Sequence, residues 1–267
     1  RHVPEEVRRT RLPEVVELVH TYLGLDPGRD LIPVHPTAHY AVGGIPTDVW
    51  GRVVVDEQNT VLPGLYAAGE CACVSVHGAN RLGTNSLVDI LVFGRRAGRD
   101  MAQYARAAGT PALSGSVAAG AVQHLRDLVG REGPESPVRL RDELQRVMQE
   151  HVSVFRTEAG LRRALDTIYD LQDRFTRIGL QDRGSIYNQN LLEAWEVGCL
   201  LDVAEATTVA ALTRQESRGV HYREDYPRRD DATWLKHTLL ARTALREYDI
   251  RFKPVVITRF PPKERVY

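Results

Sequence analysis

The feature that most limits the fold of this chain is a change of sequence pattern near residue 85. Before it, short apolar or β-branched runs at 40–42, 52–55 and 65–68 predict strands. Turn residues separate these runs, namely Gly51, Asn59, Pro63 and Gly64. After it, apolar residues recur at helical spacing almost to the C-terminus. The pattern therefore predicts an α+β protein, with short strands first and long helices after them.

The helical pattern divides into separate segments. Residues 5–23 predict a helix that stops at the turn residues Gly24, Pro27 and Gly28. A second helix is expected from near Ser86, with one face formed by Leu87, Ile90, Leu91, Gly94, Gly98 and Met101. Strands are expected again at 248–258, and Pro261-Pro262 is expected to start an extended tail.

Two further stripes predict long antiparallel helices joined near Gly179 and Gly184. The first stripe contains Leu161, Ala164, Leu165, Ile168, Gln172, Phe175 and Ile178. The second contains Leu192, Trp195, Cys199, Val203, Ala206 and Ala210. We expect both stripes to lie in the core rather than to hold a cofactor.

Composition excludes several classes of function. The 35 Lys and Arg residues balance the 35 Asp and Glu residues, so no overall charge attracts nucleic acid or an acidic membrane surface. No apolar run reaches the roughly 20 residues that a spanning helix needs, so we expect no direct membrane span. The start lacks both an initiator Met and a signal-peptide pattern, and we interpret it as the middle of a longer protein.

The three cysteines predict a reducing compartment rather than a disulfide framework. Cys71 and Cys73 are separated by one residue, and no second pair completes a four-ligand set. We expect no metal site, and we interpret both thiols as reduced and structural.

The segment GLYAAGE at 64–70 is a short apolar run that ends in Gly69 and Glu70. Open α/β sheets bind ligands at the carboxyl ends of their strands. Glu70 could therefore accept a hydrogen bond from a cofactor hydroxyl, or it could be a solvated loop residue. The segment alone does not separate these two interpretations.

The next segment, HGANRLGTNSL at 77–87, leads directly into the predicted helix. A helix start offers free N–H groups and a partial positive charge, which suits an anion or an electron-rich carbonyl. Asn85 and Ser86 are good capping residues, but capping does not explain Arg81 in the same turn. A guanidinium held there is suited to binding a carboxylate through two hydrogen bonds.

These segments resemble the succinate dehydrogenase/fumarate reductase flavoproteins. PTAHYAVGGIPTD at 36–48, GLYAAGE and HGANRLGTNSL match that family in order and spacing. FGRRAG at 93–98, ESRGVH at 216–221, REDYP at 223–227, Asp230-Asp231 and the closing PPKERVY extend the likeness over essentially the whole chain. The resemblance is specifically to the C-terminal half of a succinate dehydrogenase flavoprotein subunit.

The resemblance implies a set of site residues. His39 and Arg81 resemble the histidine and arginine that bind a substrate carboxylate. Glu70 resembles the acidic residue on the FAD ribityl chain. Ser86 and Leu87, with Asn85 before them, resemble the helix start that faces the pyrimidine end of the flavin, where reduction places negative charge.

The same resemblance implies oxidation of succinate to fumarate, with hydride transfer to FAD and electrons passed to an iron–sulfur subunit and quinone. Membrane-anchor subunits would hold such a protein peripherally on the cytoplasmic side of a bacterial inner membrane. The family's FAD pyrophosphate site, covalent-flavin histidine and proton-transferring arginine lie upstream of the matching region, so no catalytic residue is assigned here. We therefore expect this chain alone to be incomplete.

The implied domains are the end of a capping domain (1–35), the C-terminal segment of an FAD-binding α/β domain (36–103), a helical domain (104–220) and a small C-terminal α+β domain (221–267). The nearest alternative function is fumarate reductase, with the same residues used in reverse. L-aspartate oxidase has a related HGANR segment, but the HYAVGGIPTD and KERVY segments argue against it. A third alternative is a non-catalytic fragment that docks an iron–sulfur subunit.

Overall fold

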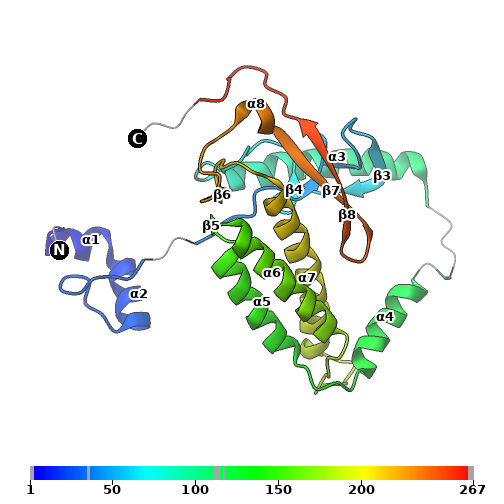
Figure 1. Cartoon of the computed structure of the whole chain (residues 1–267), viewed down its shortest axis with the longest axis horizontal. Coiled ribbons are helices and arrows are strands. Elements are labelled where there is room, and N and C mark those ends of the chain that lie inside the picture. The colour runs from blue at the N-terminus through cyan, green and yellow to red at the C-terminus, as the bar shows by residue number, and fades with distance from the viewer. Residues whose placement is uncertain (1–2, 35–36, 111–114, 117, 264–267) are drawn as a thin grey trace. The chain divides into compact units, whose positions relative to one another are not determined.

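The computed structural model describes residues 3–34, 37–110, 115–116 and 118–263. The chain forms two compact units, Arg1–Thr37 and Ala38–Tyr267, and each is described by itself below (Figure 1). Pro36 of the PTAHYAVGGIPTD segment and residues 264–267 of the closing PPKERVY segment lie outside the described residues.

The first unit contains two helices where the sequence predicted one over 5–23. Helix α1 covers Glu5–Arg11 and helix α2 covers Pro13–Leu23. The break falls at Leu12 because Pro13 has no N–H to continue α1, although its fixed φ suits the first turn of α2. Gly24 ends α2 in a left-handed conformation, as the predicted Gly/Pro cluster indicated.

The second unit begins with two small sheets of two strands each. Strand β1 (Ile45–Pro46) pairs in parallel with β4 (Ala72–Cys73), and β2 (Arg52–Val54) pairs antiparallel with β3 (Val61–Tyr66). The predicted strand at 52–55 is confirmed, whereas the one at 40–42 is wrong. Gly43 and Gly44 adopt positive φ angles of 127° and 117°, so extended pairing starts only after them.

Pro63 and Gly64 were predicted as turn residues but lie inside β3. Among the described residues this sheet has two strands, so β3 has an edge without a partner strand, where a missing Pro N–H costs nothing. The pairing register shifts within β2, and Gly64 has a φ of 82°, which fits a local bulge. The predicted strand at 65–68 is thus shifted toward the N-terminus.

Helix α3 covers Asn85–Ala108, close to its predicted start. The expected apolar face is largely exposed, since Leu87 and Leu91 are 62% and 71% accessible. The buried residues are Asp89 and Ala97, which lie eight positions apart on the same side of the helix. The sequence therefore predicted the helix correctly and its inner face wrongly.

The next helices along the chain are α4 (Ala119–Gly130), α5 (Pro137–His151), α6 (Glu158–Phe175) and α7 (Gln189–Thr213). Helices α5, α6 and α7 lie side by side (Figure 1) and enclose the main hydrophobic core. The α6 stripe is confirmed, because Leu161, Ala164 and Ile168 are fully buried. The predicted link near Gly179 and Gly184 joins α6 to α7.

The stripe predicted for α7 faces outward instead of inward. Trp195 and Val203 are 48% and 64% exposed, whereas the core receives Val197 and Leu201 on another side of the helix. Apolar residues occur all round α7, so periodicity alone could not select the face that packs against α5 and α6.

The last segment is a hairpin. Two short elements precede it, namely strand β6 (Tyr222–Arg223) and helix α8 (Asp231–Trp234). Strand β6 pairs in parallel with β5 (Phe155–Arg156). Strands β7 (Lys236–Ala244) and β8 (Glu247–Pro254) pair antiparallel. β8 was predicted, whereas no strand was predicted at 236–244, where Leu, Ala and Arg favour helices. Pairing with β8 overrides that propensity.

Within the part of the chain that the structure describes, no helix combines the length and apolar character needed to cross a bilayer.

Candidate functional site

The pairing of β1 with β4 brings the HYAVGG segment beside the end of the GLYAAGE segment. Ile45 donates its N–H to the Cys71 carbonyl at 2.9 Å, and Thr47 donates to the Cys73 carbonyl at 3.1 Å. A side chain at Gly44 would lie 2.4 Å from the Cys71 carbonyl oxygen. Only glycine permits this approach at position 44, and the positive φ of 127° at Gly43 also favours glycine there.

Glu70 fixes the same loop from the other side. Its Oε1 accepts a hydrogen bond from the backbone N–H of Ala41 at 2.9 Å, across 29 residues of sequence. Ala41 lies two residues after His39, which is exposed. Glu70 is therefore not simply a solvated loop residue; its carboxylate orients the segment that carries His39.

Tyr40 is the centre of the site. The guanidinium carbon of Arg81 lies 4.5 Å from the centroid of the Tyr40 ring, and the His77 ring meets the same ring edge-on at 5.7 Å. Both Tyr40 Oη and Arg81 Nε are buried without a hydrogen-bond partner among the described residues. Buried polar atoms of this kind are costly unless another group satisfies them. The two atoms suit a polar or anionic ligand bound between these segments.

Asp89 holds the other side of this cluster. His77 Nε2 donates to Asp89 Oδ2 at 3.0 Å, and the two side chains are only 12% and 4% exposed. Residues 40–43 and 72–78 line a small hollow together with Asp89. The first turns of α3 thus anchor the HGANR loop through a buried His–Asp pair.

The N-terminus of α3 has no side-chain cap. Thr84 is the N-cap with a φ of 65°, and neither its side chain nor an acidic residue in the first turn satisfies the free N–H groups. Asn85 and Ser86 lie inside the first turn, so neither of them is the N-cap residue. An uncapped helix start retains partial positive charge. These residues fit the pyrimidine end of a flavin, on which negative charge develops.

The structure thus brings most of the sequence-predicted site residues into one region. Arg81 lies against the ring of Tyr40, which directly follows His39 in the chain, and Glu70 accepts a hydrogen bond from the same loop. Asn85, Ser86 and Leu87 form the start of α3. Sequence reasoning missed Tyr40 and Asp89. A signal for Asp89 was present, since it is an acidic residue within the otherwise apolar run LVDILVF.

Cys71 is exposed and Cys73 half-buried. Among the described residues, no group of three or more His, Cys, Asp or Glu side chains is arranged to hold a metal ion.

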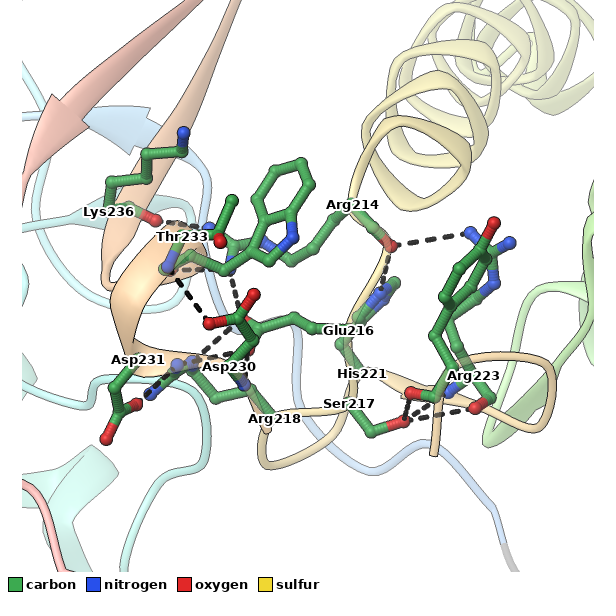
Figure 2. A network of polar contacts seen from close by, with 12 residues as sticks. Arg214, Glu216, Ser217, Arg218, His221, Arg223, Asp230, Asp231, Thr233 and Lys236 are labelled. Carbon is green, nitrogen blue, oxygen red and sulfur yellow. Dashed lines mark hydrogen bonds and ion pairs between the residues drawn. The ribbon is translucent and has the colours of Figure 1, made fainter. Parts of the chain in front are cut away.

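A second polar network lies where α7 ends (Figure 2). Glu216 is fully buried and receives hydrogen bonds from Arg218 at 2.8 and 3.0 Å, from Arg214, and from the Asp230 N–H at 2.9 Å. Arg218 also donates to Asp231 at 2.7 Å. The buried charge of Glu216 is therefore neutralised by two arginines, as a buried ion requires.

The same network continues through His221 and Arg223. Arg156 donates to His221 Nδ1 at 2.7 Å, and His221 Nε2 donates to the Arg214 carbonyl at 3.1 Å. Burial, reinforced by the charge of Arg156, lowers the pKa of His221 to about 4. Hydrogen bonds from Arg223 lower the pKa of Asp225 to about 2. His221 is thus a neutral connector at pH 7.

Two family models match the chain. The model described as fumarate reductase flavoprotein C-term matches residues 141–267, and the FAD binding domain model matches residues 1–87. The fumarate reductase flavoprotein subunit of Escherichia coli strain K12 is 42% identical over 271 residues, covering 100% of this chain and 44% of that protein. The succinate dehydrogenase flavoprotein subunit of Coxiella burnetii is 40% identical, covering 99% of this chain and 46% of that protein.

Solved structures show the same likeness. A mutant of E. coli quinol fumarate reductase FrdA superposes with a TM-score of 0.91 at 42% identity, over 100% of this chain and 45% of that chain. Sdh1 of Mycobacterium smegmatis in complex with UQ1 gives a TM-score of 0.81 at 35% identity, over 95% of this chain and 41% of that chain. The chain therefore spans less than half the length of the relatives that it matches.

Proposed function

We propose, from the premise that this chain belongs to the succinate dehydrogenase/fumarate reductase flavoprotein family, that it supplies part of the FAD site and part of the dicarboxylate site of an enzyme that oxidises succinate to fumarate. FAD is the cofactor, in keeping with the FAD-binding model over residues 1–87. The four-domain division predicted from sequence, with its boundaries after residues 35, 103 and 220, belongs to the same proposal.

The position of Arg81 is the observation that carries this proposal. Its guanidinium stacks on Tyr40 while its buried Nε has no partner among the described residues. The ring that it stacks on belongs to Tyr40, the residue directly after His39, and the uncapped start of α3 follows four residues after Arg81. A fixed, partly unsatisfied guanidinium in that place suits a ligand carboxylate, which accepts two parallel N–H···O bonds.

Each residue has a distinct task in this proposal. Arg81 and His39 hold a substrate carboxylate and so orient the C–H bond that breaks. The first turn of α3, with Asn85, Ser86 and Leu87, stabilises negative charge at the pyrimidine end of the isoalloxazine. Glu70 uses Oε1 for Ala41, which leaves Oε2 for a ribityl hydroxyl. FAD, when bound, supplies the hydride acceptor.

Fumarate reduction is the second candidate, because the E. coli relative is named a fumarate reductase and the C. burnetii relative a succinate dehydrogenase. The same residues serve both directions. We further propose that electrons pass to an iron–sulfur subunit and quinone, and that anchor subunits hold the protein peripherally on the cytoplasmic side of a bacterial inner membrane. The likeness to complexes named with menaquinol and UQ1 supports this assignment.

Both directions can be measured on the native complex. Succinate-dependent reduction of an artificial dye and fumarate-dependent oxidation of a reduced dye give the two rates, and their ratio assigns the direction. We expect the succinate reaction to be the faster. A native complex that retains FAD but shows neither reaction would contradict the proposed function.

A further inference from the structure

The turn in the ESRGVH segment touches the loop that carries Arg81. Val220 donates its N–H to the carbonyl of Ala79 at 2.9 Å. A side chain at Gly219 would lie 2.1 Å from that carbonyl oxygen and 2.8 Å from the Ala79 Cβ. Ala79 precedes Arg81 by two residues. A segment about 140 residues further along the chain therefore sets the position of the HGANR backbone.

The conformation of this turn requires glycine. Arg218 and His221 exchange backbone hydrogen bonds of 2.8 and 3.1 Å, so Gly219 and Val220 are the two central residues of a tight hairpin turn. Gly219 has a φ of 59° at the first central position, where residues with a side chain are disfavoured. Both its backbone angle and its contact with Ala79 exclude a Cβ atom.

The base of the turn is rigidly held (Figure 2). Glu216 is fully buried and binds the Arg218 guanidinium through both carboxylate oxygens, and Asp231 binds the same guanidinium. His221 at the other end is fixed by Arg156 and by the Arg214 carbonyl. Because several charge-assisted hydrogen bonds hold the turn, its backbone cannot easily shift to relieve a steric clash at Gly219.

We propose that Gly219 is a positioning residue for the dicarboxylate site: the Gly219–Val220 tip, held by the Glu216–Arg218 pair, presses on Ala79 and so sets where the Arg81 guanidinium meets the substrate carboxylate. This inference rests on the proposed function. It assigns to the ESRGVH segment a role in substrate binding, although none of its side chains is required to touch substrate. It also predicts that disturbing the tip changes dicarboxylate affinity without releasing FAD, because Glu70 and the start of α3 lie outside the contact.

The test is Gly219→Ala in the full-length, FAD-containing complex. Gly24→Ala is the matched control, because Gly24 has a similar φ of 64° but nothing within 4 Å of an added Cβ. We expect KM for succinate and the dissociation constant of fumarate, measured by flavin absorbance, to rise at least tenfold in Gly219→Ala. The flavin-to-protein ratio should stay at the wild-type value, and Gly24→Ala should leave both constants unchanged.

Arg218→Lys is a milder variant that keeps the charge but loses the two-pronged bond to Glu216. We expect it to raise KM for succinate severalfold with flavin content unchanged. It tests the same role if Gly219→Ala does not assemble into the complex. An unchanged KM in the assembled variants, or a rise in KM that only parallels loss of flavin, would overturn the positioning role. A wild-type complex without dicarboxylate turnover would instead contradict the proposed function, so the two failures are distinguishable.

Discussion

Glu70 accepts a hydrogen bond from the backbone N–H of Ala41 at 2.9 Å, and this single contact connects the GLYAAGE segment to the loop that carries His39. The sequence linked Glu70 only to the cofactor. The structure shows that one oxygen of this carboxylate binds the proposed substrate loop, and in the proposed function its other oxygen binds FAD.

Replacing Glu70 should therefore affect both ligands. In the full-length protein, we expect Glu70→Leu to lower the flavin-to-protein ratio after gel filtration and to raise KM for succinate about fivefold in the molecules that keep FAD, since one lost hydrogen bond costs about 1 kcal/mol. Glu70→Gln retains an acceptor oxygen for Ala41 and should preserve KM. Full flavin occupancy and unchanged KM in Glu70→Leu would show that neither contact matters.

Arg81→Lys should retain FAD but lose most turnover. A lysine keeps the positive charge near Tyr40 but cannot form two parallel bonds to a carboxylate. We expect a loss of about 2–4 kcal/mol of transition-state stabilisation, measured as kcat/KM for succinate. Arg96→Lys is the control, because Arg96 lies 5.6 Å from the centroid of the Trp50 ring and neither residue belongs to the proposed site. Near-normal succinate oxidation by Arg81→Lys would remove Arg81 from the substrate site.

The cysteines beside the site should be dispensable. Cys71 and Cys73 contribute to the β1–β4 pairing through their backbone carbonyls, which alanine preserves. We expect the double variant Cys71→Ala/Cys73→Ala to keep succinate oxidation within a few-fold of wild type, with an unchanged flavin redox potential. A shift of that potential on thiol modification of the wild-type protein would contradict a purely structural role.

The buried His221 predicts a specific dependence of stability on pH. Its pKa is lowered from 6.5 to about 4, so between those pH values the imidazole is protonated in the unfolded chain and neutral in the folded protein. The free energy of unfolding should then fall as pH decreases from 6.5 to 4, by on the order of 2–3 kcal/mol. Asp225 has a pKa of about 2, so its contribution to the free energy of unfolding is lost only at a lower pH than that of His221.

Denaturant unfolding of His221→Gln across this range tests the assignment. The variant should lose the slope between pH 6.5 and 4, whereas His124→Gln, which replaces an exposed histidine on α4, should retain it. An equal slope in wild type and His221→Gln would mean that other groups cause the acid sensitivity.

Much of the architecture could be predicted because it depends on local pattern. The α6 stripe from Leu161 to Ile168 was assigned to the correct face, since polar residues occupy the rest of that helix. The helix after HGANR was placed within one residue of its observed start. β7 was missed because its residues favour a helix in isolation, and only β8 supplies the partner that makes it a strand.

The sequence by itself determined the α+β class, the family and the start of α3, because short motifs and periodicity are encoded in neighbouring residues. Only the tertiary structure decided which face of α7 is buried, because both faces are apolar and packing against α5 and α6 makes the choice. It likewise decided that Gly219 meets Ala79, since a contact between segments 140 residues apart depends on how the whole chain folds and leaves no local pattern in either segment.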